Sequence, residues 1–175
     1  MKKLAAILTI LLLVGCDRAL AQEDPARNLE IMRGLVERTF SEKEPGWTCK
    51  SVAPMEGSAD VIIDQCESGD WEISFAIIKH ASADEAASAL REFRNHHEVE
   101  ERAAKKRGVE DYKKIKEELP SLGDGGFSWA AYGSTAVAFR QGKLTVYVSV
   151  VRPVLSHDEA LSKRFAHHIA QAVPR

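Results

Sequence analysis

Apolar and polar residues alternate along several short segments in the second half of the chain. Between Leu144 and Val151 every second residue is apolar and β-branched residues are frequent, which is typical of a half-buried β-strand. Residues 135–139 alternate in the same way. Gln141-Gly142 can form the tight turn between the two segments because glycine accepts a positive φ. The pattern therefore predicts a β-hairpin over residues 135–151.

A helical pattern follows this hairpin. Ser156 and Glu159 form an S-x-x-E capping box, in which the hydroxyl accepts from a backbone N–H of the first turn and the carboxylate reaches back to the serine N–H. Apolar residues then recur every four positions and form one stripe on the helix, which we expect to pack on the sheet: Leu161, Phe165, Ile169 and Val173.

The same succession of strand, strand and helix occurs earlier in the chain. Residues 57–65 match residues 133–141 at Gly, Ser, Val and Gln, and residues 82–88 match residues 156–162 at Ser, Asp, Glu, Ala and Ser. One interpretation is a duplicated β-β-α unit, with its two copies related by a pseudo-twofold axis. The other is that strand-to-helix junctions often carry Ser-x-x-Glu and that short matches arise by chance.

The rest of the chain predicts the following further elements. A helix begins at Asp24-Pro25, buries one face and ends at Glu44-Pro45-Gly46. Strands are expected at 47–52, 61–63 and 71–77, and another begins near Phe127. A second helix begins at Ser82, becomes almost wholly charged between Glu98 and Arg107 and stops at Gly108. Residues 109–119 allow either a short helix or a strand.

Together these elements predict an α+β fold, an antiparallel sheet with helices packed on one face. The helices that begin near Ser82 and Ser156 are expected on the same face. The predicted core residues come from both halves of the chain: Trp71, Ile73, Phe75, Val137, Phe139, Val146, Val148, Leu161, Phe165 and Ile169.

The N-terminus has the pattern of an export signal. Two lysines precede an apolar run of eleven residues, Leu4 to Val14, which is too short to span a bilayer but suits a signal-peptide core. Leu13-Val14-Gly15-Cys16 resembles the lipobox of bacterial lipoproteins, and Ala19-Leu20-Ala21 resembles a signal-peptidase site. We favour the lipobox, with Cys16 as the lipid attachment site, because a cysteine at the end of an apolar core is otherwise uncommon.

This interpretation divides the chain into a signal and tether, residues 1–21, and a single α+β domain, residues 22–175. Asp17 after the lipidated cysteine resembles an inner-membrane retention signal. The expected location is therefore the periplasmic face of the inner membrane, reached through a lipid anchor. Cleavage after Ala21 would instead leave the protein soluble in the periplasm.

Cys49 and Cys66 are the two cysteines of the folded part under either cleavage. They lie on neighbouring predicted strands, where a hairpin can place them opposite one another, and an exported chain meets oxidising conditions. We therefore predict a Cys49–Cys66 disulfide.

Net charge argues against some partners. The formal charge of −2 becomes −4 when Lys2 and Lys3 are removed with the signal. A mildly acidic chain with mixed charges argues against nucleic acid as a partner and against a polybasic membrane-binding patch.

Gly123-Asp124-Gly125-Gly126-Phe127, followed by a hairpin that reads apolar-x-apolar-Arg140-x-Gly142, resembles many small exported bacterial domains, including lipoproteins, that are mostly uncharacterised. The resemblance covers about residues 119–173. It implies an α+β domain with helices on one face of an antiparallel sheet, and it identifies no catalytic residue.

Candidate chemistry is sparse. The six histidines suggest a metal hypothesis, since His96 with Glu100 and His97 with Glu101 have the i,i+4 spacing of two ligands on a helix. Adjacent histidines point to different sides of a helix, however, so each pair offers one ligand to any one ion. The chain has no H-E-x-x-H, C-x-x-C, G-x-S-x-G, P-loop or dinucleotide fingerprint. Four aromatic residues that could line a ligand groove are Trp47, Trp71, Trp129 and Tyr132.

The sequence therefore favours a non-catalytic binding or accessory module without a cofactor, a metal or catalytic residues. Its partner would be an envelope protein or a small ligand. The alternative is a small periplasmic enzyme, a metal-dependent hydrolase, whose site is assembled from scattered histidines and carboxylates. Two or more histidines that converge with a carboxylate in one enclosed pocket would favour that enzyme.

Overall fold

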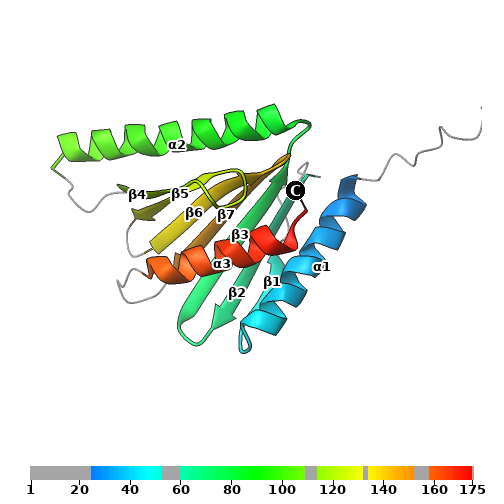
Figure 1. The fold of residues 1–175 in the computed structure, drawn as a ribbon. Helices are drawn as coiled ribbons and strands as arrows, with labels where there is room; N and C mark the ends of the chain where they lie inside the picture. The colour runs from blue at the N-terminus through cyan, green and yellow to red at the C-terminus, as the bar shows by residue number, and fades with distance from the viewer. Residues whose placement is uncertain (1–24, 53–59, 109–113, 132–133, 152–157, 175) are drawn as a thin grey trace, which may run out of the picture.

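The computed structural model describes residues 25–52, 60–108, 114–131, 134–151 and 158–174. These residues form three helices that pack against one sheet (Figure 1). In chain order the elements are α1 (Pro25–Lys43), β1 (Thr48–Val52), β2 (Val61–Ser68), β3 (Trp71–Lys79), α2 (Ala83–Lys106), β4 (Lys114–Leu119), β5 (Gly126–Ala131), β6 (Ser134–Gln141), β7 (Leu144–Val151) and α3 (Glu159–Ala172).

The sheet has seven strands in the order β1-β2-β3-β7-β6-β5-β4, and every neighbouring pair is antiparallel. The strands β3 and β7, each of which precedes a helix, pair with one another at the centre. The predicted α+β class with an antiparallel sheet is confirmed. The segment whose structure the sequence left open contains a strand, β4, at one edge of the sheet.

The position of one helix requires a correction. α1 and α3 lie together on one face of the sheet, where Phe40 of α1 contacts both Phe75 of β3 and Phe165 of α3. α2 lies on the other face (Figure 1). Phe93 of α2 packs on Tyr147 of β7. Successive side chains of a strand point to opposite faces, so Tyr147 lies on the face opposite to that of the adjacent β7 residues, which face the core between the sheet, α1 and α3. The helices therefore cover both faces, and the two that follow Ser82 and Ser156 do not share one.

This arrangement also limits the duplication hypothesis. Antiparallel neighbours such as β3 and β7 are related by a twofold axis perpendicular to the sheet, and that axis keeps equivalent helices on the same face. The strand pairs β2–β3 and β6–β7 fit the axis, but α2 and α3 do not. The burial of β6 agrees with helices on both faces of the sheet. All five residues from Thr135 to Phe139 are buried, so this strand is covered on both faces.

The main core lies between the sheet and the α1–α3 layer. Phe40, Phe75 and Phe165 form edge-to-face contacts there, with ring centroids 4.8–5.6 Å apart. α1 buries one face, as the sequence predicted, and that face consists of Leu29, Met32, Val36 and Phe40. Nine of the ten core residues predicted from sequence are also buried, namely Ile73, Phe75, Val137, Phe139, Val146, Val148, Leu161, Phe165 and Ile169, whereas Trp71 is partly buried against them.

The helix boundaries follow capping chemistry. Ser82 caps α2 and accepts from the Glu85 N–H, while the Glu85 carboxylate accepts from the Ala81 N–H. Gly108, the predicted end of this helix, follows it and has a φ of +73°, a conformation that glycine commonly adopts after the last turn of a helix. α3 begins later than its predicted capping box, with Asp158 rather than Ser156 as the N-cap. Aspartate caps helices as well as serine does, and Ser156 itself lies outside the described residues.

The Cys49–Cys66 disulfide is present, which confirms that prediction. The two residues are directly opposite one another in the β1–β2 pair. The bond therefore ties the edge strand β1 to the sheet at a point where Cys66 is fully buried.

Candidate functional site

A groove of about 640 Å³ opens at one end of the sheet. The first half of α1 forms one wall, and the opposite side comes from the β6–β7 turn, the end of β3 and the last residues of α3. Residues as distant in sequence as Asn28 and Pro174 line it. In Figure 1 the C-terminal end of the chain accordingly lies near the beginning of α1.

The α1 wall is apolar and exposed. Ile31 and Leu35 line the groove and keep 55% and 38% of their surface accessible, whereas Met32 between them is buried. The two side chains are four residues apart and so lie on one side of the helix, beside the stripe that packs on the sheet. α1 therefore has two apolar stripes, one in the core and one facing the groove.

Two lysines stand on the opposite side of the groove. Lys79 ends β3 and is paired in register with Leu144, which directly follows Lys143. The His80 N–H donates to the Lys143 carbonyl at 2.9 Å, so the junction after β3 is fixed to the β6–β7 turn. Within the described part of the chain neither lysine forms an ion pair. The groove thus combines an apolar wall with two lysines that line its opposite side.

The turn between β6 and β7 is held by side chains beneath it. Gln141 is buried, and its Nε2 donates to the carbonyl oxygens of Ala170 and Val173 at 3.1 and 2.6 Å, which satisfies the carboxyl end of α3. Gly142 has a φ of +57°, and its N–H donates to Asp124 at 2.7 Å. These bonds fix the position of the turn and hence of the Lys143 backbone.

A second apolar cavity, of about 280 Å³, lies between α2 and the sheet. Phe93, Trp129 and Tyr147 line it, and Phe93 contacts both of the other rings. Burial raises the pKa of the Tyr147 phenol, and a hydrogen bond with Thr145 partly offsets this increase. A phenol with a raised pKa stays protonated at neutral pH.

The aromatic residues singled out from the sequence do not form one groove. Trp47 contacts Phe165 at 4.9 Å and Trp71 packs on the same core, so both belong to the α1–α3 side. Trp129 lies on the α2 side, where it stacks on His97. Tyr132 lies outside the described residues.

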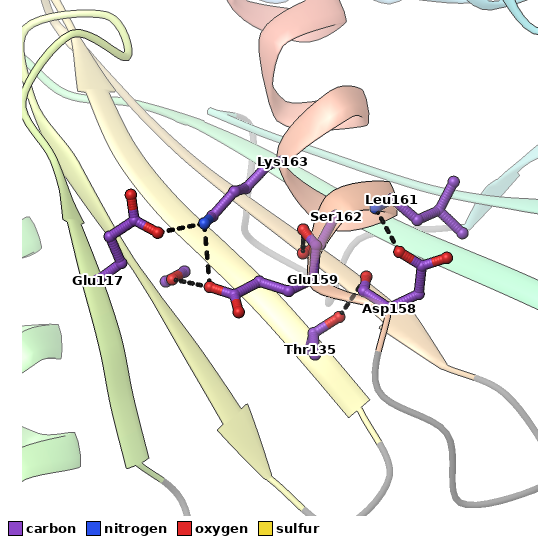
Figure 2. Close-up of polar contacts among 8 residues, drawn as sticks. Glu117, Thr135, Asp158, Glu159, Leu161, Ser162 and Lys163 are labelled. Carbon is purple, nitrogen blue, oxygen red and sulfur yellow. Dashed lines mark hydrogen bonds and ion pairs between the residues drawn. The ribbon is translucent and has the colours of Figure 1, made fainter.

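A cluster of charged residues joins the beginning of α3 to strands β4 and β5 (Figure 2). Lys163 lies between Glu117 and Glu159, and Glu159 also accepts from the Ser128 hydroxyl at 3.0 Å. A hydrogen bond with Glu117, supported by Glu159, raises the pKa of Lys163. The raised pKa favours the charged form of the lysine, and Ser128 is fully buried. The cluster fixes the start of α3.

The histidines are distributed over separate sites. His80 bonds to Thr145, and His168 bonds to Glu44, which Arg164 also contacts at 2.7 Å. His96 and His97 both approach Glu100, at 3.4 and 3.5 Å, but His96 is 66% exposed, so this is not an enclosed pocket. His167 is exposed. His157 lies outside the described residues.

Across the described ranges, no group of three or more His, Cys, Asp or Glu side chains is arranged to hold a metal ion. In the same ranges no helix has the length and apolar character needed to cross a membrane. Cys16, the proposed lipid attachment site, precedes the described residues. The structure thus locates the disulfide cysteines and most of the histidines. The candidate site that it provides is the groove beside α1 and not a cluster of histidines.

Sequence reasoning missed the groove residues Ile31, Leu35, Lys79 and Lys143. The apolar pair had a detectable signal, because two large apolar residues four positions apart and off the main stripe of a helix indicate a second apolar surface. The lysines had none, since only the β3–β7 register brings positions 79 and 143 to the same end of the sheet.

Comparison with known proteins gave no match to a family model and none to a curated protein. Among solved structures, 85% of this chain is similar to 89% of a GTP binding regulator from Thermotoga maritima, with 12% sequence identity and a TM-score of 0.44. A likeness of that strength assigns no function to the chain.

Proposed function

We propose that this protein is a non-catalytic binding module at the extracytoplasmic face of the membrane, and that it binds through the groove beside α1. The observation that carries the proposal is the exposure of Ile31 and Leu35 on a groove wall opposite two lysines without ion-pair partners in the described chain. A concave, mainly apolar site with a few polar groups is the usual form of a ligand site.

The polar side chains elsewhere support binding over catalysis. A hydrolase needs a nucleophile with its base, two carboxylates in contrasting environments or an open metal site. Lys163 and Glu44 are each held in ion pairs that join elements of the fold. Lys79 and Lys143 line the groove and form no ion pair among the described residues. They can attract an anionic group.

The membrane part of the proposal rests on the sequence. A lipid on Cys16 would leave eight residues, Asp17 to Asp24, before α1 begins. Such a tether reaches at most about 29 Å when fully extended. Because the groove includes Asn28 and Ile31 in the first two turns of α1, it would lie at the end of the domain closest to the anchor.

The anchor is tested by intact mass of protein isolated from the envelope of cells that express the full chain. We expect a mature N-terminus at Cys16 that carries acyl chains, and fractionation with membranes. The matched variant Cys16→Ala should lose the acyl mass. An unmodified N-terminus at Gln22 in the wild-type protein would contradict the proposed anchor.

The groove is tested in the same cells with a photo-reactive amino acid at position 31. We expect light-dependent adducts there, whether lipid or protein. The control is the same amino acid at position 99, since Val99 on α2 is equally exposed at 55%. Adduct levels at 31 no higher than at 99 would refute binding through the groove.

A further inference from the structure

We propose that the groove takes a single-chain amphiphile, with its acyl chain against the Ile31–Leu35 wall and its anionic head at Lys79 and Lys143. The head would be a carboxylate or a phosphate, as in a fatty acid or a lysophospholipid. This inference rests on the proposed binding function and specifies its ligand.

The volume and the apolar wall favour a small apolar ligand. A groove of about 640 Å³ lies within the range of roughly 300–1,000 Å³ that is usual for small-molecule sites. The apolar side chains that line it come from α1, β7 and the end of α3: Ile31, Met32, Leu35, Leu144, Ala172 and Val173. An extended methylene chain can contact all of these elements.

The charges around the groove favour an anionic head. Asp124, the carboxylate beneath the β6–β7 turn, accepts from the Gly142 N–H and lies 3.5 Å from Arg140, so its charge is offset. Glu30 on α1 is paired with Arg33 at 2.5 Å. Lys79 and Lys143, in contrast, have no such partner among the described residues.

The carboxyl end of α3 would otherwise oppose an anion, because helix C-termini carry partial negative charge. Here the carbonyl oxygens of Ala170 and Val173 accept hydrogen bonds from the side chain of Gln141. An anionic head can therefore approach the lysines without meeting free carbonyl groups at these two positions.

The experiment uses the full chain with phosphatidylcholine vesicles that contain a small fraction of a photo-reactive probe. The three probes are a diazirine palmitic acid, its methyl ester and a lysophosphatidylglycerol with the same diazirine chain. After irradiation, cross-linked peptides are mapped by mass spectrometry. We expect the acid or the lysolipid to label residues 28–35 or 171–174 at least fivefold more than the ester.

Four variants separate the chain contact from the head contact. Ile31→Asp with Leu35→Asp should reduce labelling at least tenfold, whereas the control Val99→Asp should leave it unchanged. Lys79→Ala with Lys143→Ala should abolish the preference for the anionic probes, whereas Lys106→Ala on α2 should preserve it. The substituted apolar side chains are exposed, and thermal unfolding of each variant verifies that it is folded.

The outcomes distinguish this inference from the function on which it rests. Labelling by the acid alone or by the lysolipid alone supports the inference and identifies the source of the head group. Equal labelling by acid and ester overturns the anionic head, and labelling no higher than that of the apolar-wall variant overturns the ligand class. If no probe labels the groove but the residue at position 31 captures a protein in cells, the binding function stands and the amphiphile is refuted.

Discussion

Phe165→Ala tests whether α3 is fixed to the sheet by the aromatic cluster beneath it. Phe165 has no accessible surface, and its ring lies 4.8 Å from that of Phe40 and 4.9 Å from that of Trp47. The substitution removes a whole phenyl ring from a core that also includes part of α1. α1, α3 and the sheet all pack in this core and hold one another in place. We therefore expect the cavity left by the missing ring to collapse only partially.

The expected loss is about 3–5 kcal/mol of unfolding free energy, as for other buried Phe→Ala changes. Aromatic pairs of this geometry contribute roughly 0.5–1.5 kcal/mol each beyond the burial of their area. The pairs with Phe40 and Trp47 would therefore account for about 1–3 kcal/mol of the loss. A double-mutant cycle of Phe165→Ala with Phe40→Ala should give a coupling energy in the single-pair range.

The assay is guanidinium unfolding at equilibrium with the disulfide intact, followed by both circular dichroism and tryptophan fluorescence. His167→Ala is the matched control, because it changes an exposed residue on the same helix and should shift stability by no more than about 0.5 kcal/mol. A loss below about 1 kcal/mol for Phe165→Ala, with an unchanged m-value, would mean that the aromatic cluster does not hold α3.

Three other properties give further predictions. Cys49→Ala with Cys66→Ala removes the bond across a separation of 17 residues and should cost about 3 kcal/mol in the chain-entropy model; a reductant that destabilises this variant as much as the wild-type protein would contradict that assignment. Gly123→Ala would place a Cβ 2.3 Å from the Arg140 carbonyl at a φ of +59°, and should lower the melting temperature, whereas Gly34→Ala in open space on α1 should raise stability by about 0.5–1 kcal/mol. Burial raises the pKa of Asp64 above its ordinary value of 3.8, and Arg33 opposes this increase. The folded state therefore binds the proton of this carboxyl more tightly than the unfolded state does. The stability that this tighter proton binding contributes is complete below pH 3.8 and is lost as pH rises through the raised pKa. The unfolding free energy of the wild-type protein relative to Asp64→Asn should therefore fall over that pH range, and a rise would refute the sign.

The sequence predicted the strands because their signal is local. Alternation along β3 and β7 depends only on which side chains meet the core, and the structure preserves it. β4 was ambiguous because its residues, Lys114 to Leu119, are mostly charged and suit an exposed helix as well as an edge strand. What makes it a strand is the pairing with β5, which is a tertiary contact.

The face on which α2 packs was not predictable from the helix alone. An apolar stripe shows that a helix has a partner, but both faces of a sheet offer one. The informative signal lay in β6, where Ala136 and Ala138 alternate with Val137 and Phe139. A run of consecutive apolar residues in a strand indicates burial on both faces, and the alanines leave room for α2 on the second face.

The groove follows from the way this sheet is assembled. The central β3–β7 pair places the end of β3 beside the β6–β7 turn, and the buried Gln141 fixes the carboxyl end of α3 at the same place. α1 begins there as well, so four chain segments meet at one end of the sheet and leave a concave surface between them. The Lys163 cluster joins the opposite end of α3 to β4 and β5. If Cys16 is lipidated, the short tether would present the groove end to the bilayer and the Lys163 end to the periplasm. Cleavage after Ala21 would remove that orientation without changing the groove. Under our proposal, the state of Cys16 would therefore decide whether a ligand is drawn from the bilayer or from solution.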